Sequence, residues 1–360
     1  MRSDALYREF LETFRYRISR WSARKLPFKP KVVYVEVSNR CNLDCTMCTR
    51  PRDLPEQGEM SAAVFDRVLP DLRKFEQVFF AAWGETLLSP HVVDFLHALG
   101  GPDHTRGFAT NGTLLQGETA ERILEKGAYE IDVSIDAGCA ETYAQVRGYD
   151  KFNDVISNLS SFLKLRKRKH SKTRVSWIFV MMRSNFRELP QALRLAADHG
   201  CDKFIAKHLD TAPSREVLSE ALYDTGYVPP PGPALRHEFE RTLAECRKIA
   251  DGRIEWCAHP VVHGIDFLGV KGPYFRLYLD RDGNLTPCTL IGLNDTKPYA
   301  MNPVEEDWVL GNVREKTIDE MIRSPRYVEF QETWLSRKIP PPCKGCLRTA
   351  RLGEDGQCYA

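Results

Sequence analysis

The sequence contains no run of about eighteen apolar residues, which a membrane-spanning helix needs. Its N-terminus also lacks the basic stub and short apolar core of a secretory signal. Acidic and basic residues nearly cancel, with a formal net charge of +2, so no excess of positive charge points to nucleic acid. We therefore expect a cytoplasmic protein that neither crosses a membrane nor binds nucleic acid.

Cysteine, in contrast, is not scarce, with 11 in 360 residues. A short secreted chain would use them for disulfides. In a long chain of a reducing compartment, thiols are metal ligands or small buried residues. Apolar residues make up 42% of the chain, which is enough for one large domain and a smaller one.

Three thiols, Cys41, Cys45 and Cys48, fall within eight residues directly after an apolar run. Thiolates are soft ligands that suit iron–sulfur clusters and zinc. A four-iron cluster takes one cysteine per iron, so a local group of three leaves one iron without a protein ligand. The pattern predicts a cluster with an open iron, and a zinc knuckle or a chance grouping is the alternative.

The spacing C-x₃-C-x₂-C resembles the signature of the radical S-adenosylmethionine (radical SAM) superfamily. The resemblance implies a 4Fe-4S cluster whose open iron binds the amine and carboxylate of S-adenosyl-L-methionine. One electron from the cluster then cleaves this cofactor to a 5′-deoxyadenosyl radical, which abstracts hydrogen from a substrate. It also implies a one-electron reductant such as flavodoxin or ferredoxin.

Apolar runs alternate with helical patterns from residue 31 to residue 210, which predicts an α/β fold with a parallel sheet. The predicted strands are Val32–Ser38, Gln77–Trp83, Arg106–Asn111, Glu130–Asp136, Arg174–Met182 and Lys203–Asp210. The predicted helices are Ser61–Lys74, His91–Leu99, Glu118–Lys126, one from about Glu141, Phe152–Lys169 and Leu189–His199. Six such units resemble the partial (β/α)₆ barrel of the radical SAM fold, whereas the alternative is an open doubly wound sheet.

The second predicted strand ends in Ala82-Trp83-Gly84-Glu85-Thr86. Glycine lets the backbone approach a ligand closely, and a carboxylate accepts hydrogen bonds from an ammonium group. The segment resembles the family's Gly-Gly-Glu-Pro motif, although Trp83 and Thr86 differ from it. The resemblance implies that Gly84 and Glu85 bind the methionine amino group of the cofactor.

Alternation along the fourth predicted strand places Asp132, Ser134 and Asp136 on one face. Because a buried parallel strand is normally apolar on both faces, we expect a polar barrel interior. By position, the resemblance implies five cofactor contacts: Met47 beneath the adenine, Asn111 and Asn185 at the ribose, Ser134 near the cofactor and Arg147 at the methionine carboxylate. From the residues alone, Asn111 lies in a turn, Met47 packs in its loop and Arg147 lies on the surface.

The sixth predicted strand ends in Lys207-His208-Leu209-Asp210, at the rim where barrels of this kind carry their catalytic groups. Lys207 and His208 are therefore candidates for a proton acceptor, and surface charge is the alternative. The basic run 166–172 ends a predicted helix, where cations oppose the helix dipole and are solvated.

The remaining segments differ in composition from the barrel at residues 31–210. Residues 1–30 carry an amphipathic helix that we expect to pack on the core, and peripheral membrane contact is the alternative. Residues 211–252 are rich in proline and predict a linker or lid followed by a helix from about residue 234 to residue 250. Residues 253–360 predict a small α+β domain.

This last segment contains a predicted glycine-turn hairpin that ends at Cys288. Its layout resembles the SPASM or twitch extension of radical SAM enzymes, with the Gly-x₄-Cys element at Gly283 and Cys288. No cysteine lies between Cys346 and Cys358, although the full SPASM pattern needs more thiols there. The resemblance implies one auxiliary 4Fe-4S cluster held by Cys257, Cys288, Cys343 and Cys346, with Cys358 as a substitute ligand. A structural zinc site is the alternative.

An auxiliary cluster with four protein ligands can accept the electron that a substrate radical must lose to become a carbonyl. We therefore expect a two-electron oxidation of a small polyol-like or amino-sugar substrate. Peptide modification and radical epimerisation are the enzyme alternatives, and a metal-stabilised scaffold is the non-enzyme alternative. Few residues precede Val32, which favours a small molecule over a peptide bound by a separate leader-binding domain.

Overall fold

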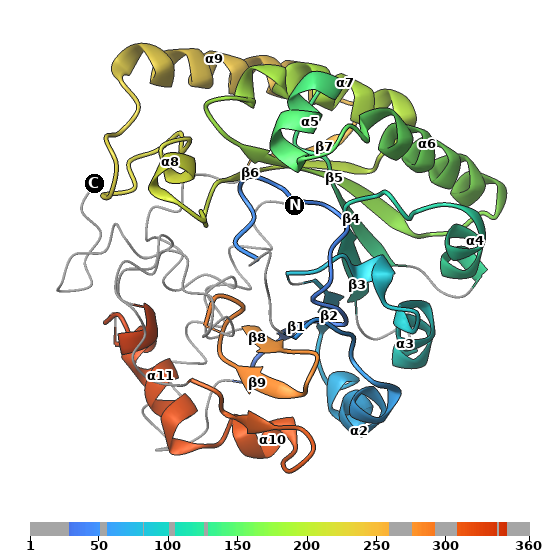
Figure 1. The fold of residues 1–360 in the computed structure, drawn as a ribbon, viewed down its shortest axis with the longest axis vertical. Helices are drawn as coiled ribbons and strands as arrows, with labels where there is room; N and C mark the ends of the chain where they lie inside the picture. The colour runs from blue at the N-terminus through green and yellow to red at the C-terminus, as the bar shows by residue number, and fades with distance from the viewer. Residues whose placement is uncertain are drawn as a thin grey trace.

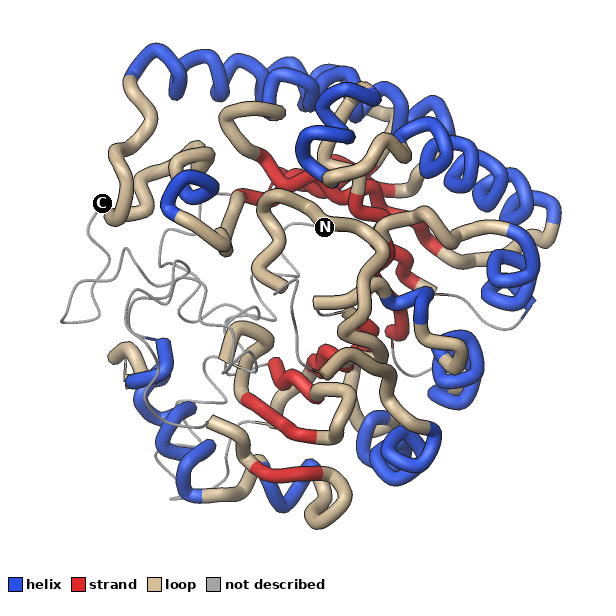
Figure 2. Tube along the Cα trace, in the orientation of Figure 1, coloured by secondary structure: helices blue, strands red, loops and turns tan. Residues whose placement is uncertain are grey.

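The computed structural model describes residues 29–50, 56–81, 83–100, 105–125, 129–258, 276–291, 308–336 and 338–343. The predicted N-terminal helix lies outside these ranges, as do Cys346 and Cys358. No helix in the described ranges is long and apolar enough to cross a membrane. The strands form an arc, and helices cover its outer side (Figures 1 and 2).

The described strands belong to one sheet in the order β10-β9-β8-β1-β2-β3-β4-β5-β6-β7. Their bounds are β1 (Val32–Val35), β2 (Gln77–Phe80), β3 (Thr105–Thr110), β4 (Glu130–Ser134), β5 (Arg174–Met181), β6 (Lys203–His208), β7 (Glu255–Ala258), β8 (Arg276–Leu279), β9 (Asn284–Thr286) and β10 (Gly311–Asn312). The strands from β8 through β1 to β7 are parallel, and β9 is antiparallel to β8 and to β10. The predicted α/β fold with a parallel sheet is confirmed.

The helices that alternate with the parallel strands are α2 (Ala62–Leu72), α3 (Val92–Leu99), α4 (Gly117–Glu125), α5 (Ala140–Arg147), α6 (Phe152–Arg168), α7 (Leu189–His199) and α9 (Pro233–Ala250). The predicted lid contains a further short helix, α8 (Arg215–Leu218). The C-terminal part adds α10 (Ile318–Met321), α11 (Pro325–Leu335) and the 3₁₀ turn η5 (Pro341–Cys343). Every predicted strand and helix of the barrel has a counterpart. Several strands end earlier than predicted, because their last residues turn into the loops of the site.

The core lies between the outer face of the sheet and the helices. On β1, Val33 and Val35 are completely buried and pack in this core with Phe65 of α2 and Phe95 of α3. Burial of each such side chain stabilises the fold by about 1.5–3 kcal/mol. Tyr34 alternates with these valines and therefore faces the inside of the arc. The sheet thus has an apolar outer face and an inner face that is free for other chemistry.

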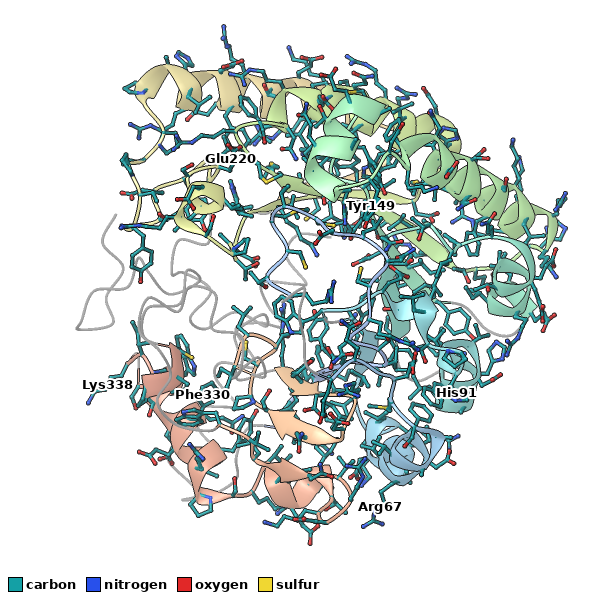
Figure 3. All side chains as sticks on the ribbon, viewed as in Figure 1. Arg67, His91, Tyr149, Glu220, Phe330 and Lys338 are labelled. Carbon is teal, nitrogen blue, oxygen red and sulfur yellow. The ribbon has the colours of Figure 1, made fainter. Side chains whose placement is uncertain are left out.

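Strands from beyond the predicted domain boundary at residue 253 join the barrel sheet at both of its ends. β7 extends it beside β6, and β8 pairs in parallel with β1, so the C-terminal segment contributes to both ends of the barrel sheet. Arg67 of α2, labelled in Figure 3, donates from Nε to the Val313 carbonyl at 3.3 Å. Asp71 of the same helix accepts the Ile318 N–H at 2.8 Å. The domain division itself stays a prediction.

Candidate active site

The loop Cys41–Cys48 follows β1 at the carboxyl end of the parallel strands, inside the arc (Figure 1). This is the end at which enzymes built on parallel barrels place their active sites. Residues from the neighbouring strand ends and from α5 contact the loop, and they define the geometry of the site.

Each of the three loop sulfurs accepts a hydrogen bond from an N–H group. The donors are the Leu43 backbone for Cys41, Arg147 Nη1 for Cys45 at 3.5 Å and the Arg50 backbone for Cys48 at 3.4 Å. Such bonds stabilise metal-bound thiolates and tune iron–sulfur clusters. No three His, Cys, Asp or Glu side chains of the described ranges surround one point where a single metal ion could sit. Three closely spaced thiolates suit a four-iron cluster, in which each binds a separate iron and one iron stays open.

Burial raises the pKa of the Cys41 thiol and raises that of Cys48 to about 11. Both thiols are therefore protonated at neutral pH while they are free. Metal ligation requires thiolates, so loading the cluster must release these protons.

The C-terminus of α5 docks on the cysteine loop. The Thr46 N–H donates to the Val146 carbonyl at 2.9 Å. Gly148 has φ +80°, and a Cβ there would lie 2.5 Å from the Asp44 carbonyl oxygen. Only glycine allows both this left-handed conformation and this close approach. The motif Val146-Arg147-Gly148 therefore packs directly on the cysteine loop.

Arg147 is buried, and its Nη2 lies 2.5 Å from Asp136 Oδ2. Burial opposes the charge of Arg147, but Asp136 and Cys45 outweigh it and hold its pKa above the usual range. A surface position for this arginine is wrong. Arg147 Nε has no hydrogen-bond partner among the described residues, so one buried N–H group remains for a ligand.

The Glu85 carboxylate joins the ends of β2 and β3. It accepts hydrogen bonds from Thr110 Oγ1 and the Asn111 N–H, each at 2.6 Å, and from the Leu87 N–H at 3.0 Å. Burial raises the pKa of Glu85, and these donors oppose the rise. Since each carboxylate oxygen has two lone pairs, capacity for an ammonium donor remains.

Gly84 approaches the protein's own backbone rather than open space. A Cβ there would lie 2.1 Å from the Ser38 carbonyl oxygen. The adjacent Glu85 N–H donates to the Arg40 carbonyl at 2.7 Å. Glycine is thus required so that the loop after β2 can pack on the start of the cysteine loop, which corrects the predicted reason for it.

The two asparagines that are predicted at the ribose have different surroundings in the structure. Asn111 Nδ2 donates to Asn42 Oδ1 of the cysteine loop at 2.8 Å, at the edge of the site. Asn185 is completely buried, donates to the Asp136 and Val180 carbonyls, and accepts the Met182 N–H. Its predicted ribose contact is therefore corrected, because the carboxamide holds the loop after β5 instead.

The register between β5 and β6 shows that the two predicted proton acceptors, Lys207 and His208, lie on opposite faces of the sheet. Lys207 pairs with Val180, and His208 pairs with Met181, whose side chain is completely buried in the outer core. His208 packs against Tyr223 and Phe239, with ring centroids 5.4 and 5.9 Å apart. Residues in register share a face, so His208 points away from the site and its predicted catalytic role is corrected. Lys207 faces the inside.

The inner face of β4 is polar, as alternation predicted, and Ser176 extends it onto β5, whereas Ile178 and Val180 on the same face of β5 are apolar. Ser134 is half-buried there, and Asp132 shares a hydrogen bond with Ser176 of β5. Burial raises the pKa of Asp132, whereas Lys207 and Ser176 oppose the rise. Beside this wall Met47 packs in a small apolar cluster with Val146, Met182 and Leu209.

Glu36 is an inner-face residue that the motifs did not indicate. Its carboxyl group accepts hydrogen bonds from the Tyr278 hydroxyl and the Arg281 backbone. Burial, followed by the nearby Asp280 carboxylate, raises the pKa of Glu36 to about 7. The one sequence feature that could have indicated an inner-face role for Glu36 is its position as a single acid between Val35 and Val37 in an apolar segment.

The predicted auxiliary ligands are not assembled in the described residues. Cys257 lies on β7, in register with Ile205 of β6. Cys288 follows β9, and Cys343 is buried in η5. Seven strands separate β7 from β9 in the sheet order, and Figure 1 shows them at opposite ends of the arc. The structure therefore does not bring Cys257 to Cys288 as predicted.

Two family models match the chain: the radical SAM superfamily over residues 35–196 and the SPASM iron–sulfur cluster-binding domain over residues 271–347. A tungsten-containing aldehyde ferredoxin oxidoreductase cofactor-modifying protein of Pyrococcus furiosus is 25% identical over 342 residues, which cover 89% of this chain and 88% of that protein. The mycofactocin maturase MftC of Mycobacterium ulcerans is 26% identical over 205 residues, covering 52% and 53%.

Among solved structures, anSMEcpe with bound AdoMet and a Cp18Cys peptide matches with a TM-score of 0.60 at 16% identity, covering 90% of each chain. At this identity the match shows the fold. The predicted radical SAM enzyme is confirmed, with an S-adenosylmethionine-binding 4Fe-4S cluster and auxiliary iron–sulfur ligation in the SPASM region. The chain belongs to the radical SAM superfamily and carries a C-terminal SPASM iron–sulfur domain.

Proposed function

We propose that this radical SAM enzyme modifies a peptide held against the inner face of β4, β5 and β6. The observation that carries the proposal is the polar, half-buried wall of Asp132, Ser134 and Lys207, which contrasts with the mostly apolar outer face. A peptide offers backbone donors and acceptors to such a wall. β7 ends the described sheet, and a sheet edge can pair with an extended chain. The solved structure of similar fold that holds a Cp18Cys peptide supports the same substrate class.

In this proposal Cys41, Cys45 and Cys48 hold the cluster, which supplies the electron for S-adenosylmethionine cleavage when it is bound. Glu85 accepts from the methionine ammonium group, and Gly84 allows the loop after β2 to close on the site. The free Nε of Arg147 binds the methionine carboxylate, a pairing that suits a guanidinium group. Met47 supports the adenine, and Asn111 and Ser134 contact the rest of the nucleoside.

The auxiliary cluster accepts the electron that the substrate radical gives up. We propose Cys288, Cys343 and Cys346 as its ligands, with Cys358 as the fourth. Radical SAM enzymes need a reductant, and we propose flavodoxin or ferredoxin for this chain.

A second candidate is the oxidation of a small hydroxylated molecule, which was preferred from the sequence. Lys207 supports it, because it faces the inside of the barrel and can take the hydroxyl proton. The Pyrococcus furiosus relative, which is named a cofactor-modifying protein, also favours a substrate other than a peptide. The polar inner wall and the similar fold of a structure that holds a peptide weigh more towards the peptide.

Anaerobic turnover with two substrate libraries separates these functions. The reconstituted enzyme is incubated with S-adenosylmethionine, dithionite and either random peptides or polyols and amino sugars. We expect a peptide pool to stimulate 5′-deoxyadenosine formation and to yield a product of changed mass. Stimulation by polyols alone, with a product two mass units lighter, would reject the peptide in favour of the second candidate. An unchanged mass with solvent deuterium incorporated would indicate epimerisation.

A further inference from the structure

A buried chain of polar contacts connects the end of β4 to one sulfur of the cysteine loop. Asp136 is completely buried and contacts Arg147 at 2.5 Å. Arg147 Nη1 in turn donates to Cys45 Sγ at 3.5 Å. A guanidinium group therefore lies directly against one of the three sulfurs, with little water to screen its charge.

The surrounding contacts fix the position of this guanidinium group. Arg147 is the last residue of α5, and its neighbours on both sides contact the loop: the Val146 carbonyl accepts from Thr46, and Gly148 lies against Asp44. These contacts on both sides of Arg147 hold the end of α5, and with it the arginine, against the cysteine loop.

Asp136 is held equally firmly. Its Oδ1 accepts the Val180 N–H at 2.6 Å, and its carbonyl accepts from Asn185 Nδ2 at 3.0 Å. Its backbone has φ +60°, a left-handed conformation that is uncommon for a residue other than glycine. A strained residue that persists through several contacts is a sign of a functional constraint.

We propose that Arg147 raises the reduction potential of the cluster bound at Cys45 and that Asp136 positions Arg147 for this task. The cluster gains one electron from the external reductant and no proton. The added negative charge is stabilised by the fixed positive charge and by the N–H···S hydrogen bond, and hydrogen bonds to sulfur are known to set cluster potentials. The inference rests on the proposed ligation by Cys41, Cys45 and Cys48.

The test is a redox titration of the reconstituted full-length protein, followed by electron paramagnetic resonance without S-adenosylmethionine or substrate. The signal missing from the Cys41→Ala/Cys45→Ala/Cys48→Ala variant identifies the cluster of the loop. If that variant loses no iron, the ligation itself fails, which is a separate result from the potential of Arg147 variants.

Arg147→Met should make reduction of this cluster about tenfold less favourable, which for a one-electron couple is a shift of about 59 mV to lower potential. Arg147→Lys, which keeps the charge without the planar fork, should lie between Arg147→Met and the wild type. Arg166→Met is the matched control, because Arg166 pairs with Asp202 at the opposite end of the strands. The cluster potential of this variant should equal that of the wild type. An unchanged potential in Arg147→Met with normal iron content would overturn the proposal. If Arg147→Met holds no iron, a wild-type potential in Arg147→Lys would do so.

Asp136→Asn tests the positioning role through the sign of the shift. Loss of a negative charge alone would raise the potential, whereas displacement of Arg147 would lower it. We expect a lower potential, in the direction of Arg147→Met. A raised potential would show that Asp136 acts only through its charge and would overturn its positioning role.

Discussion

The cysteine loop after β1 and the C-terminal cysteines solve the same problem of ligation in opposite ways. In the loop, three thiols lie within one short segment, and each sulfur already accepts an N–H. The C-terminal thiols Cys257, Cys288 and Cys343 lie on different elements, and the sheet order separates the first from the second. A local ligand set is therefore readable from spacing, whereas a distributed set depends on the path of the chain.

The largest effect should come from removing one thiol of each set. Cys45→Ala should abolish 5′-deoxyadenosine formation, because the cluster loses a ligand and the donor Arg147 loses its acceptor. Cys288→Ala should keep this reaction, measured by chromatography after dithionite reduction, and should lose only auxiliary iron. Equal loss in both variants would remove the distinction between the two regions.

A second comparison sharpens the auxiliary ligand set. Cys257→Ala should retain auxiliary iron that Cys288→Ala loses, because β7 and the β8–β9 hairpin lie at opposite ends of the arc. Iron and sulfide analysis of both proteins measures this. If Cys257→Ala loses as much iron as Cys288→Ala, the sequence-based ligand set is right and β7 must approach the hairpin in the loaded protein.

A smaller effect on cofactor binding is expected where the loop after β2 packs on the start of the cysteine loop. In Gly84→Ala the new methyl group would lie 2.1 Å from the Ser38 carbonyl oxygen, so the loop must shift. We expect binding of S-adenosylmethionine, measured by calorimetry, to weaken about tenfold, which corresponds to about 1.4 kcal/mol. Gly232→Ala is the control, since a Cβ there meets no atom within 4 Å. Similar affinities of the two variants would contradict the account of Gly84.

The last effect concerns the seam between the two regions, where Glu36 of the first meets Tyr278, Asp280 and Arg281 of the second. Because the pKa of Glu36 is raised from 4.5 to about 7, its carboxyl group is protonated more readily in the folded state. Its contribution, about 3 kcal/mol at most, is complete below pH 4.5 and is lost as the pH rises through 7.

Glu36→Gln should therefore flatten the fall in melting temperature between pH 4.5 and about 7 that the wild type shows. Glu329→Gln, on the exposed face of α11, is the control and should follow the wild type. Parallel curves for the wild type and Glu36→Gln would show that the carboxyl group is already ionised in the folded protein.

Sequence patterns predicted the barrel elements and the polar face of β4 because both follow from local periodicity. They could not choose between Lys207 and His208, since the inner face of β6 is set by its register with β5. Asn185 was placed by analogy at the ribose, but its carboxamide is consumed by loop contacts that no spacing reveals. The pairing of Glu36 with Tyr278 was likewise invisible, because it depends on β8 joining β1 across a long stretch of chain.

Cofactor cleavage by the purified chain is the most direct test of the central claim that the cysteine loop carries radical SAM chemistry. The protein is reconstituted anaerobically with iron and sulfide, its metals are quantified, and S-adenosylmethionine and dithionite are added. The account predicts iron–sulfur clusters and 5′-deoxyadenosine, both in the wild type and in Cys288→Ala. Zinc in place of iron, or clusters without any deoxyadenosine, would contradict it.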